Sequence, residues 1–217
     1  MAEMDVGSGI ELLQQRAKFV KALLIAGLVL VVAMLAGEIA EYAGIINLEE
    51  IDQSPLARLY AATALFSVVV TIVTFIAFAM WIYRAAANVV AAEVSGFEYS
   101  AGWAVGWYFI PIANLVKPFH AMRQIWNASY GQASNALNHG DPLLTIWWTT
   151  WLISNIANNI SARLSLRADT VSEAQFATML GIVGSLVSLI LYSAALRLVD
   201  RITTAQRDRL TAAHIFA

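Results

Sequence analysis

The chain has 217 residues, of which 59% are hydrophobic and only 13% are charged, and its mean hydropathy is +0.66. A soluble domain is about half apolar and about a quarter charged, so this composition excludes an ordinary soluble globular protein and indicates the bilayer. The net charge of -2 provides no basic field for nucleic acid, and the absence of cysteine excludes disulfides, thiolate metal sites and cysteine nucleophiles.

The first long apolar stretch runs over residues 19–43. A cluster of cations between residues 16 and 21 opens it, as in a signal peptide. No small-x-small cleavage site follows, and the helical pattern continues past Gly37. We therefore expect an uncleaved first membrane span, preceded by a cytoplasmic tail over residues 1–18.

Three further apolar stretches cover residues 59–83, 143–160 and 176–199. At about 1.5 Å per helical residue, such stretches match a hydrocarbon core of about 30 Å. Trp81 and Tyr83 beside Arg84 have the pattern of an interfacial aromatic belt that meets a cationic end. We predict one transmembrane helical domain over residues 19–203, followed by a cytoplasmic tail over 204–217.

A shorter apolar segment, residues 103–116, is interrupted by Pro111. A helix of this length reaches about 21 Å, which is less than the thickness of the hydrocarbon core. Proline removes a backbone donor and clashes with the preceding turn, so the helix is expected to break there. We expect a proline-broken segment that re-enters the membrane or lies at its interface, and a full crossing is the alternative.

The distribution of cations distinguishes these arrangements. If the broken segment does not cross, both termini lie on one side of the membrane with ten of the 13 Lys and Arg residues. The remaining three are Arg58, Arg163 and Arg167. If the segment crosses, the division becomes six to seven. The positive-inside rule favours the first arrangement. We therefore predict a multi-pass protein of the bacterial cytoplasmic (inner) membrane, with four spans and both termini cytoplasmic.

An amphipathic helix is predicted after the broken segment, from Pro118 to Tyr130. Phe119, Met122 and Trp126 recur at helical spacing, and polar residues occupy the other faces. Such a helix lies at the membrane surface or packs over the inner ends of the spans, and both packing and partner binding fit the pattern. The predicted fold class is an all-α integral membrane helix bundle: four transmembrane helices, a proline-broken re-entrant or interfacial segment, and an amphipathic surface helix.

The central region resembles one family of bacterial membrane proteins. The run from Gly102 to Pro118 reads Gly-Trp-Ala-Val-Gly-Trp-Tyr-Phe-Ile-Pro-Ile-Ala-Asn-Leu-Val-Lys-Pro. The likeness continues in three further runs: Trp81 to Asn88, Met122 to Trp126, and Trp147-Trp148. Together they resemble the family catalogued as domain of unknown function 4328, over residues 56–207. Members often carry proline before the Gly-Trp pair, where this chain has Ala101. The resemblance implies the fold and a membrane location, and it brings no catalytic residues.

Six residues of the cytoplasmic side are candidates for binding: Arg84, Asn88, Asn114, Lys117, Arg123 and Trp126. Arg84 and Asn88 are one helical turn apart. They suit a lipid phosphate or the loop around Asn114, because arginine grips phosphate through a planar fork. The alternative is an arginine that snorkels to the interface beside an asparagine near the end of the helix.

Asn114 and Lys117 follow the break at Pro111. A broken helix in a membrane leaves backbone groups that need partners, and the broken helices of transporters bind substrates or ions. A purely structural kink explains the same residues.

Two further sets of polar residues lie within or beside the spans. Glu38 and Glu41 adjoin the first span, where a buried pair would relay protons. Their distance from Phe19, about a bilayer thickness, places them instead at the outer headgroups. The fourth span carries polar residues that either bond helices together or line a polar path. These are Ser154, Asn155, Asn158, Asn159 and Ser161.

Signatures of enzymes are absent from the sequence. There is no His-Glu-x-x-His motif, no Gly-x-Ser-x-Gly motif and no phosphate loop, and His120, His139 and His214 are scattered. We expect no enzyme activity, no catalytic residues, no metal site and no cofactor. The leading hypothesis is a non-enzymatic module whose cytoplasmic broken segment and surface helix bind a protein or lipid partner. Expected partners are membrane lipids and a protein partner or second copy, and no nucleic acid. The alternative is a small transporter or channel that uses the break at Pro111 and the polar face of the fourth span.

Overall fold

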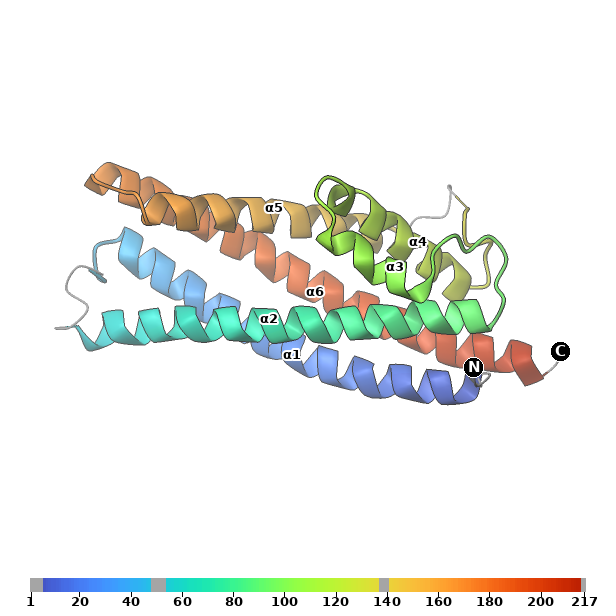
Figure 1. The fold of residues 1–217 in the computed structure, drawn as a ribbon. Helices are drawn as coiled ribbons and strands as arrows, with labels where there is room; N and C mark the ends of the chain where they lie inside the picture. Colours follow the sequence, from blue (N-terminus) through green and yellow to red (C-terminus); the bar gives the residue numbers. More distant parts are fainter. Residues whose placement is uncertain (1–5, 48–53, 137–140, 216–217) are drawn as a thin grey trace. The chain divides into compact units, whose positions relative to one another are not determined.

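The computed structural model describes residues 6–47, 54–136 and 141–215, and this part of the chain contains helices and no strand (Figure 1). The predicted all-α class is confirmed. The described part of the chain forms four long helices, and a group of short helices lies between the second and the third of them. The long helices are α1 (Val6–Tyr42), α2 (Pro55–Ala91), α5 (Pro142–Ser165) and α6 (Val171–Ile215). The short ones are α3 (Ala101–Gly106), η2 (Trp107–Phe109), η3 (Ala113–Leu115) and α4 (Lys117–Ser129).

Three of the long helices, α1, α2 and α6, are long and apolar enough to cross a membrane. Few residues in their most apolar stretches are buried, and side chains such as Val29, Leu65 and Leu186 lie on the protein surface. Extended apolar surface of this kind is typical of helices that face lipid. α5 is a helix of 24 residues, but its tryptophans and asparagines keep it out of this set of long, apolar helices.

The first and last helices of the chain, α1 and α6, extend into the two predicted tails. α1 begins at Val6, inside the predicted tail 1–18, and α6 continues to Ile215 through the predicted tail 204–217. The reason is a packing pattern in which buried apolar residues alternate at spacings of four and three, as in a coiled coil. In α1 these residues are Val6, Ile10, Leu13, Ala17 and Val20.

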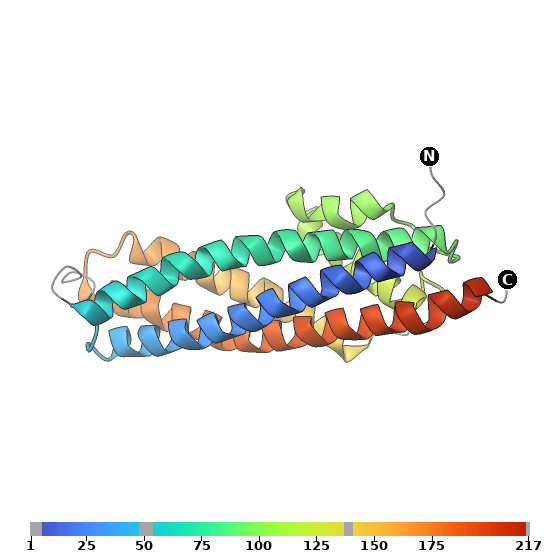
Figure 2. The same cartoon turned by 90° about the horizontal axis from the view of Figure 1, so that it is seen from below.

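The chain divides into two compact units, and unit 1 consists of Met1–Ala22, Thr74–Thr145 and Ala195–Ala217. Within it, Val6 and Ile10 of α1 form a buried apolar cluster with Leu210 of α6. The beginning of α1 and the end of α6 therefore pack side by side (Figure 2). Residues 92–100, which follow α2, also contact this cluster through Ala92 and Val94.

Unit 2 consists of Leu23–Val73 and Ile146–Ala194. Its helices approach closely at glycines, because the missing Cβ lets a side chain of the neighbouring helix contact the backbone. Tyr192 packs on Gly27, Tyr60 on Gly37, and the Asn158 carboxamide on Gly184. A Cβ at any of these glycines would clash with its partner.

Candidate functional site

The segment between α2 and α4 begins with a capped helix and then loses its regular form. The Ser100 hydroxyl accepts a hydrogen bond from the Trp103 amide at 3.3 Å and so caps the first turn of α3. The α-helix ends at Gly106, η2 supplies one tight turn, and Ile110 is extended. Regular helix begins again at Lys117, with Pro118 in its first turn, where proline is tolerated. Pro111 lies in the interruption, where its missing donor costs no helical hydrogen bond.

The turn after Pro111 is strained. Ile112 has φ 67° and ψ -50°, and the Ala113 amide donates to the Pro111 carbonyl at 2.8 Å. This is a γ-turn of the rare form whose central residue has positive φ. A β-branched residue is disfavoured there, because its Cβ approaches the backbone. Strain of this kind persists only where the surrounding structure fixes it, and it is common at binding sites.

The turn lies in a hairpin of short helices. α3 packs against α4, and η2 packs against η3, so the two arms of the hairpin lie side by side within unit 1. Two aromatic contacts fix the hairpin to α2, where the Phe75 ring meets Tyr108 and Phe109 edge-on at 6.1 and 6.0 Å. Figures 1 and 2 show α3 alongside the C-terminal part of α2.

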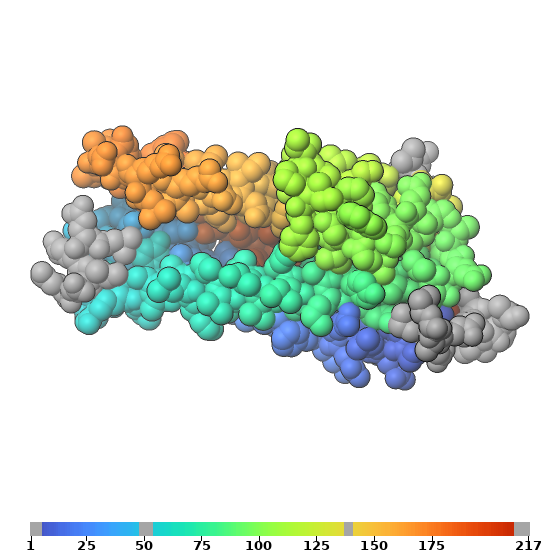
Figure 3. All heavy atoms as spheres, in the orientation of Figure 1, coloured from blue at the N-terminus to red at the C-terminus, as the bar shows by residue number. Residues whose placement is uncertain are grey.

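The far end of this hairpin exposes large apolar side chains. Ile112 is 83% exposed, Phe109 69%, and Leu115 and Val116 about half. These four residues are called the apolar tip below. Figure 3 shows the hairpin, in green, at the visible surface of unit 1.

Two cations lie on α4, which follows the apolar tip. The Lys117 ammonium lies over the Trp107 ring, 5.6 Å from its centroid, and the Arg123 guanidinium lies 6.0 Å from the Phe119 centroid. Arg123 Nε is buried and has no hydrogen-bond partner among the described residues. Burial lowers the pKa of the His120 imidazole below its ordinary value, and the charges of Arg123 and Lys117 lower this pKa further. The positive charge at neutral pH therefore comes from Lys117 and Arg123.

A reciprocal pair of hydrogen bonds ties α4 to the loop before α3. The Glu98 amide donates to Gln124 Oε1 at 3.0 Å, and Gln124 Nε2 donates to Glu98 Oε2 at 3.1 Å. Burial raises the pKa of the neighbouring Tyr99 hydroxyl, and the Glu98 carboxylate raises it further. The loop thus places one carboxylate beside α4, held by Gln124.

Two of the predicted binding residues, Arg84 and Asn88, lie inside unit 1. Arg84 is 4% exposed, and its Nε and Nη2 donate to Asn88 Oδ1 at 2.9 and 2.6 Å. Asn88 Nδ2 donates in turn to the Gly9 carbonyl at 3.3 Å and to Gln206 Oε1 at 3.0 Å. The one-turn spacing does bring the two side chains together, but the low exposure of Arg84 is that of an interior residue rather than a snorkelling one.

The network continues through residues that the sequence reasoning missed. Gln206 Nε2 donates to the Ala85 carbonyl at 3.0 Å and to Ser129 Oγ at 3.1 Å. One turn earlier on both α2 and α6, Trp81 Nε1 donates to Thr203 Oγ1 at 3.1 Å. Gln206 falls within the predicted tail. Its signal in the sequence is the four-residue spacing from the buried Leu198 and Ile202, which continues the packed face of α6.

α4 is largely buried, so packing accounts for most of its amphipathic pattern. Trp126 is 5% exposed and contacts Tyr130 in a tilted arrangement with the ring centroids 4.7 Å apart. Arg209 donates to the Tyr130 carbonyl at 2.8 Å and lies over its ring. Asn114, in contrast, is half-buried in η3, where its backbone N–H donates to the Ile110 carbonyl at 2.9 Å. The predicted binding residues thus divide between the interior (Arg84, Asn88, Trp126) and the hairpin and its edge (Asn114, Lys117, Arg123).

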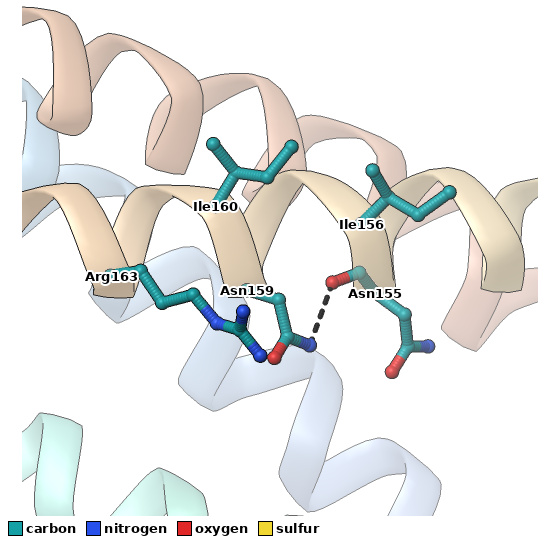
Figure 4. A pocket seen from close by; sticks show the side chains of 5 residues that line it. All are labelled: Asn155, Ile156, Asn159, Ile160 and Arg163. Atoms are coloured by element: carbon teal, nitrogen blue, oxygen red, sulfur yellow. Dashed lines mark hydrogen bonds between the residues drawn. The ribbon is translucent and has the colours of Figure 1, made fainter.

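The polar residues of α5 also divide in two. Asn155 and Asn159 each donate to a carbonyl of their own helix, at 2.8 and 2.9 Å, and line a hollow of about 330 Å³ with Ile156, Ile160 and Arg163 (Figure 4). The Ser161 hydroxyl instead donates to the Ala177 carbonyl of α6 at 2.8 Å and so links two helices. In the described part of the chain no group of three or more His, Asp or Glu residues converges as metal ligands would, and His139 lies outside that part.

The comparison with protein families identifies the chain. The family model described as "Domain of unknown function (DUF4328)" matches residues 50–204, which is more than half of the chain. The chain belongs to that family, as the resemblance of its central runs predicted. No curated protein and no solved structure matches it.

Proposed function

We propose that this member of the family is a non-enzymatic, four-span membrane module that binds anionic lipid headgroups on the cytoplasmic side. The apolar tip would enter the headgroup and acyl boundary of the cytoplasmic leaflet, and Lys117 and Arg123 would hold the phosphates above it. The observation that carries this proposal is the exposed apolar tip at a strained turn, followed by Lys117 and, further along α4, by Arg123.

The packing of the chain ends supports an even number of crossings. Val6 and Ile10 pack with Leu210, and a chain whose two ends meet on one side of a membrane crosses it an even number of times. The three apolar helices require a fourth span, and α5, at about 36 Å, is long enough. Ile146, Ile153 and Ile160 on its exposed face suit lipid. The ten-to-three division of cations favours cytoplasmic termini.

The hairpin has the chemistry of an interfacial element. A side chain that is apolar and exposed gains free energy when it leaves water, at roughly 25 cal/mol per Å². An amphipathic element with a cationic edge lies in the plane of the interface, where each Lys or Arg near anionic lipid contributes about 1 kcal/mol. The rings of Trp103 and Trp107 are in tilted contact, with centroids 4.9 Å apart, and add the aromatic residues that favour this depth.

Lipid retention tests the proposal. The full chain, extracted from nanodiscs that contain phosphatidylglycerol and phosphatidylcholine, is weighed by native mass spectrometry to count retained lipids of each class. The double variant Lys117→Gln and Arg123→Gln should retain phosphatidylglycerol on the order of ten-fold more weakly, with phosphatidylcholine unchanged. Arg207→Gln is the matched control, because Arg207 is exposed and already paired with Asp208 at 2.7 Å.

Depth of insertion tests the same surface independently. The chain has no cysteine, so Ile112→Cys carries a single spin label, and Ser95→Cys serves as an exposed reference in the same unit. The label at position 112 should collide with oxygen in the bilayer, and the label at 95 with a water-soluble nickel complex. A water-exposed label at 112, or equal phosphatidylglycerol retention by the double variant and the wild type, overturns the proposal. A protein retained in place of lipid would also overturn it.

A further inference from the structure

We propose that Glu38 is a proton-binding site inside the membrane region, formed where α1, α5 and α6 meet. The inference is independent of the lipid-binding hairpin, because every residue that carries it belongs to unit 2. Its ligand is a proton, held on a carboxyl group that faces the interior of the bundle.

Three helices contribute to the site. Glu38 comes from α1, and its carboxylate accepts a hydrogen bond from the Ser185 hydroxyl of α6. Gly181, one turn before Ser185, leaves the space in which the carboxylate lies. A Cβ built there would be 3.2 Å from Glu38 Oε1 and 3.1 Å from Ser161 Oγ of α5. Glu38 and Ser161 therefore approach the same point of α6 from two different helices.

One oxygen of the carboxylate remains without a partner. Oε2 of Glu38 is buried and accepts no hydrogen bond from the described residues. A buried polar atom without a partner is costly, and the cost is larger for a charged group than for a neutral one. A proton on the carboxyl group removes that charge. The geometry therefore fits an acid that is neutral in this arrangement of the helices.

The neighbouring groups favour a proton over a metal ion. The titratable groups near Glu38 are Glu41 on its own helix and Tyr60 on α2, which packs on Gly37. The groups that face it from α5 and α6 are the hydroxyls of Ser161 and Ser185 and carry no charge. A hard cation needs six or more oxygen ligands, whereas the proton needs a single one. Ionisable residues within a membrane commonly mark proton or ion sites.

Labelling with dicyclohexylcarbodiimide tests the proposal. The reagent adds to a protonated carboxyl group and, after transfer of the acyl group to nitrogen, leaves a stable N-acylurea with the whole mass of the reagent. Exposed carboxylates are ionised near neutral pH and react poorly. The full chain in nanodiscs is labelled between pH 5 and 9, and the adducts are located by intact and peptide mass spectrometry. We expect one adduct per chain, on Glu38, at pH 7.

Three variants make the result specific. Glu38→Gln should abolish the adduct. Ser185→Ala removes the hydrogen bond to the ionised form, so labelling should persist to a pH about one unit higher, a ten-fold change in the ratio of the two forms. Ser188→Ala is the matched control, because its hydroxyl donates to the Gly184 carbonyl of its own helix at 2.8 Å. Size-exclusion profiles and circular dichroism confirm that each variant is folded.

The proposal fails under any of three outcomes. In the first, Glu38 stays unlabelled at pH 6–7 in the folded protein. In the second, Ser185→Ala and Ser188→Ala have the same labelling profile. In the third, sodium ions protect Glu38 from labelling at constant pH. The last outcome would identify a metal cation as the ligand.

Discussion

The guanidinium of Arg84 donates two hydrogen bonds to one atom, Oδ1 of Asn88, from Nε at 2.9 Å and from Nη2 at 2.6 Å. This arrangement fixes the orientation of the carboxamide, because the oxygen must face the cation. The Nδ2 group is thereby directed towards Gly9 and Gln206, so that one residue of α2 bonds to α1 and α6. Asn88 is thus the centre of the polar interior of unit 1.

Replacement of Asn88 is expected to destabilise the protein strongly. Asn88→Ala removes one acceptor of Arg84 and the donor to Gly9 and Gln206, so three buried polar groups each lose a hydrogen bond. The free energy of unfolding should fall by about 2–4 kcal/mol. Thermal unfolding in mild detergent measures the change. Asn155→Ala is the control, because Asn155 is exposed and bonds its own helix, and it should change the stability by less than about 0.5 kcal/mol. Equal effects of the two variants would contradict the role assigned to Asn88.

Gly9 provides a steric test of the same network. A Cβ at Gly9 would lie 2.5 Å from Arg84 Nη2 and would also overlap Asn88 Oδ1. Gly9→Ala should therefore lower the stability by about 1–3 kcal/mol, although alanine is the better helix former. Gly102→Ala is the matched control, since nothing lies within 4 Å of its added Cβ, and it should be neutral or stabilising. A stabilising effect of Gly9→Ala, measured by thermal unfolding, would show that the close approach is wrong.

Ile112 combines a strained backbone conformation with an exposed apolar side chain. Ile112→Gly relieves the positive φ of a β-branched residue and should raise the stability in detergent by about 1 kcal/mol. The same change removes an exposed apolar side chain, so it should weaken the insertion of the tip into a bilayer. Leu115→Gly, in η3, is the control and should lose both stability and insertion. Loss of stability in Ile112→Gly would contradict the strained turn.

The titration of His120 predicts a pH dependence of the proposed lipid binding. Its pKa lies below the ordinary value in the folded protein, so its stabilising contribution is present above about pH 6.5 and is lost as pH falls through the folded pKa. Protonation also adds a third cation beside Lys117 and Arg123. Phosphatidylglycerol retention should therefore rise as pH falls from 7 to 5, and His120→Gln should remove the rise. An unchanged pH profile in His120→Gln would show that another group titrates.

The proposed four-span topology predicts which sites label on each side of the membrane. Ser100→Cys and Ser172→Cys replace exposed residues, the first before α3 and the second at the start of α6. A membrane-impermeant maleimide, applied to intact spheroplasts, should label position 172 and leave position 100 unlabelled. In inverted vesicles the pattern should reverse. Labelling of both from one side would contradict a fourth span through α5.

The amino-acid sequence by itself determined the elements of this protein that depend on local spacing. Long apolar stretches gave the helices, because an apolar helix satisfies its own backbone within a membrane. Pro111 determined where regular helix is interrupted, since it lacks the donor that a helix requires. The central run from Gly102 to Pro118 identified the family. The shared helix face of Arg84 and Asn88 was also readable, because residues four apart lie on one face, but their bond to each other was not predicted.

Only the tertiary structure decided which distant residues meet. Asn88 bonds Gly9 and Gln206, which lie 79 and 118 positions away along the chain, and no local pattern specifies such contacts. The fate of Glu38 was likewise a question of helix rotation: its position along α1 suggested the headgroups, but its face turns it towards Ser185. Local spacing fixes where a helix forms and which residues share a face. The partner of that face is fixed by packing, which depends on the whole chain at once.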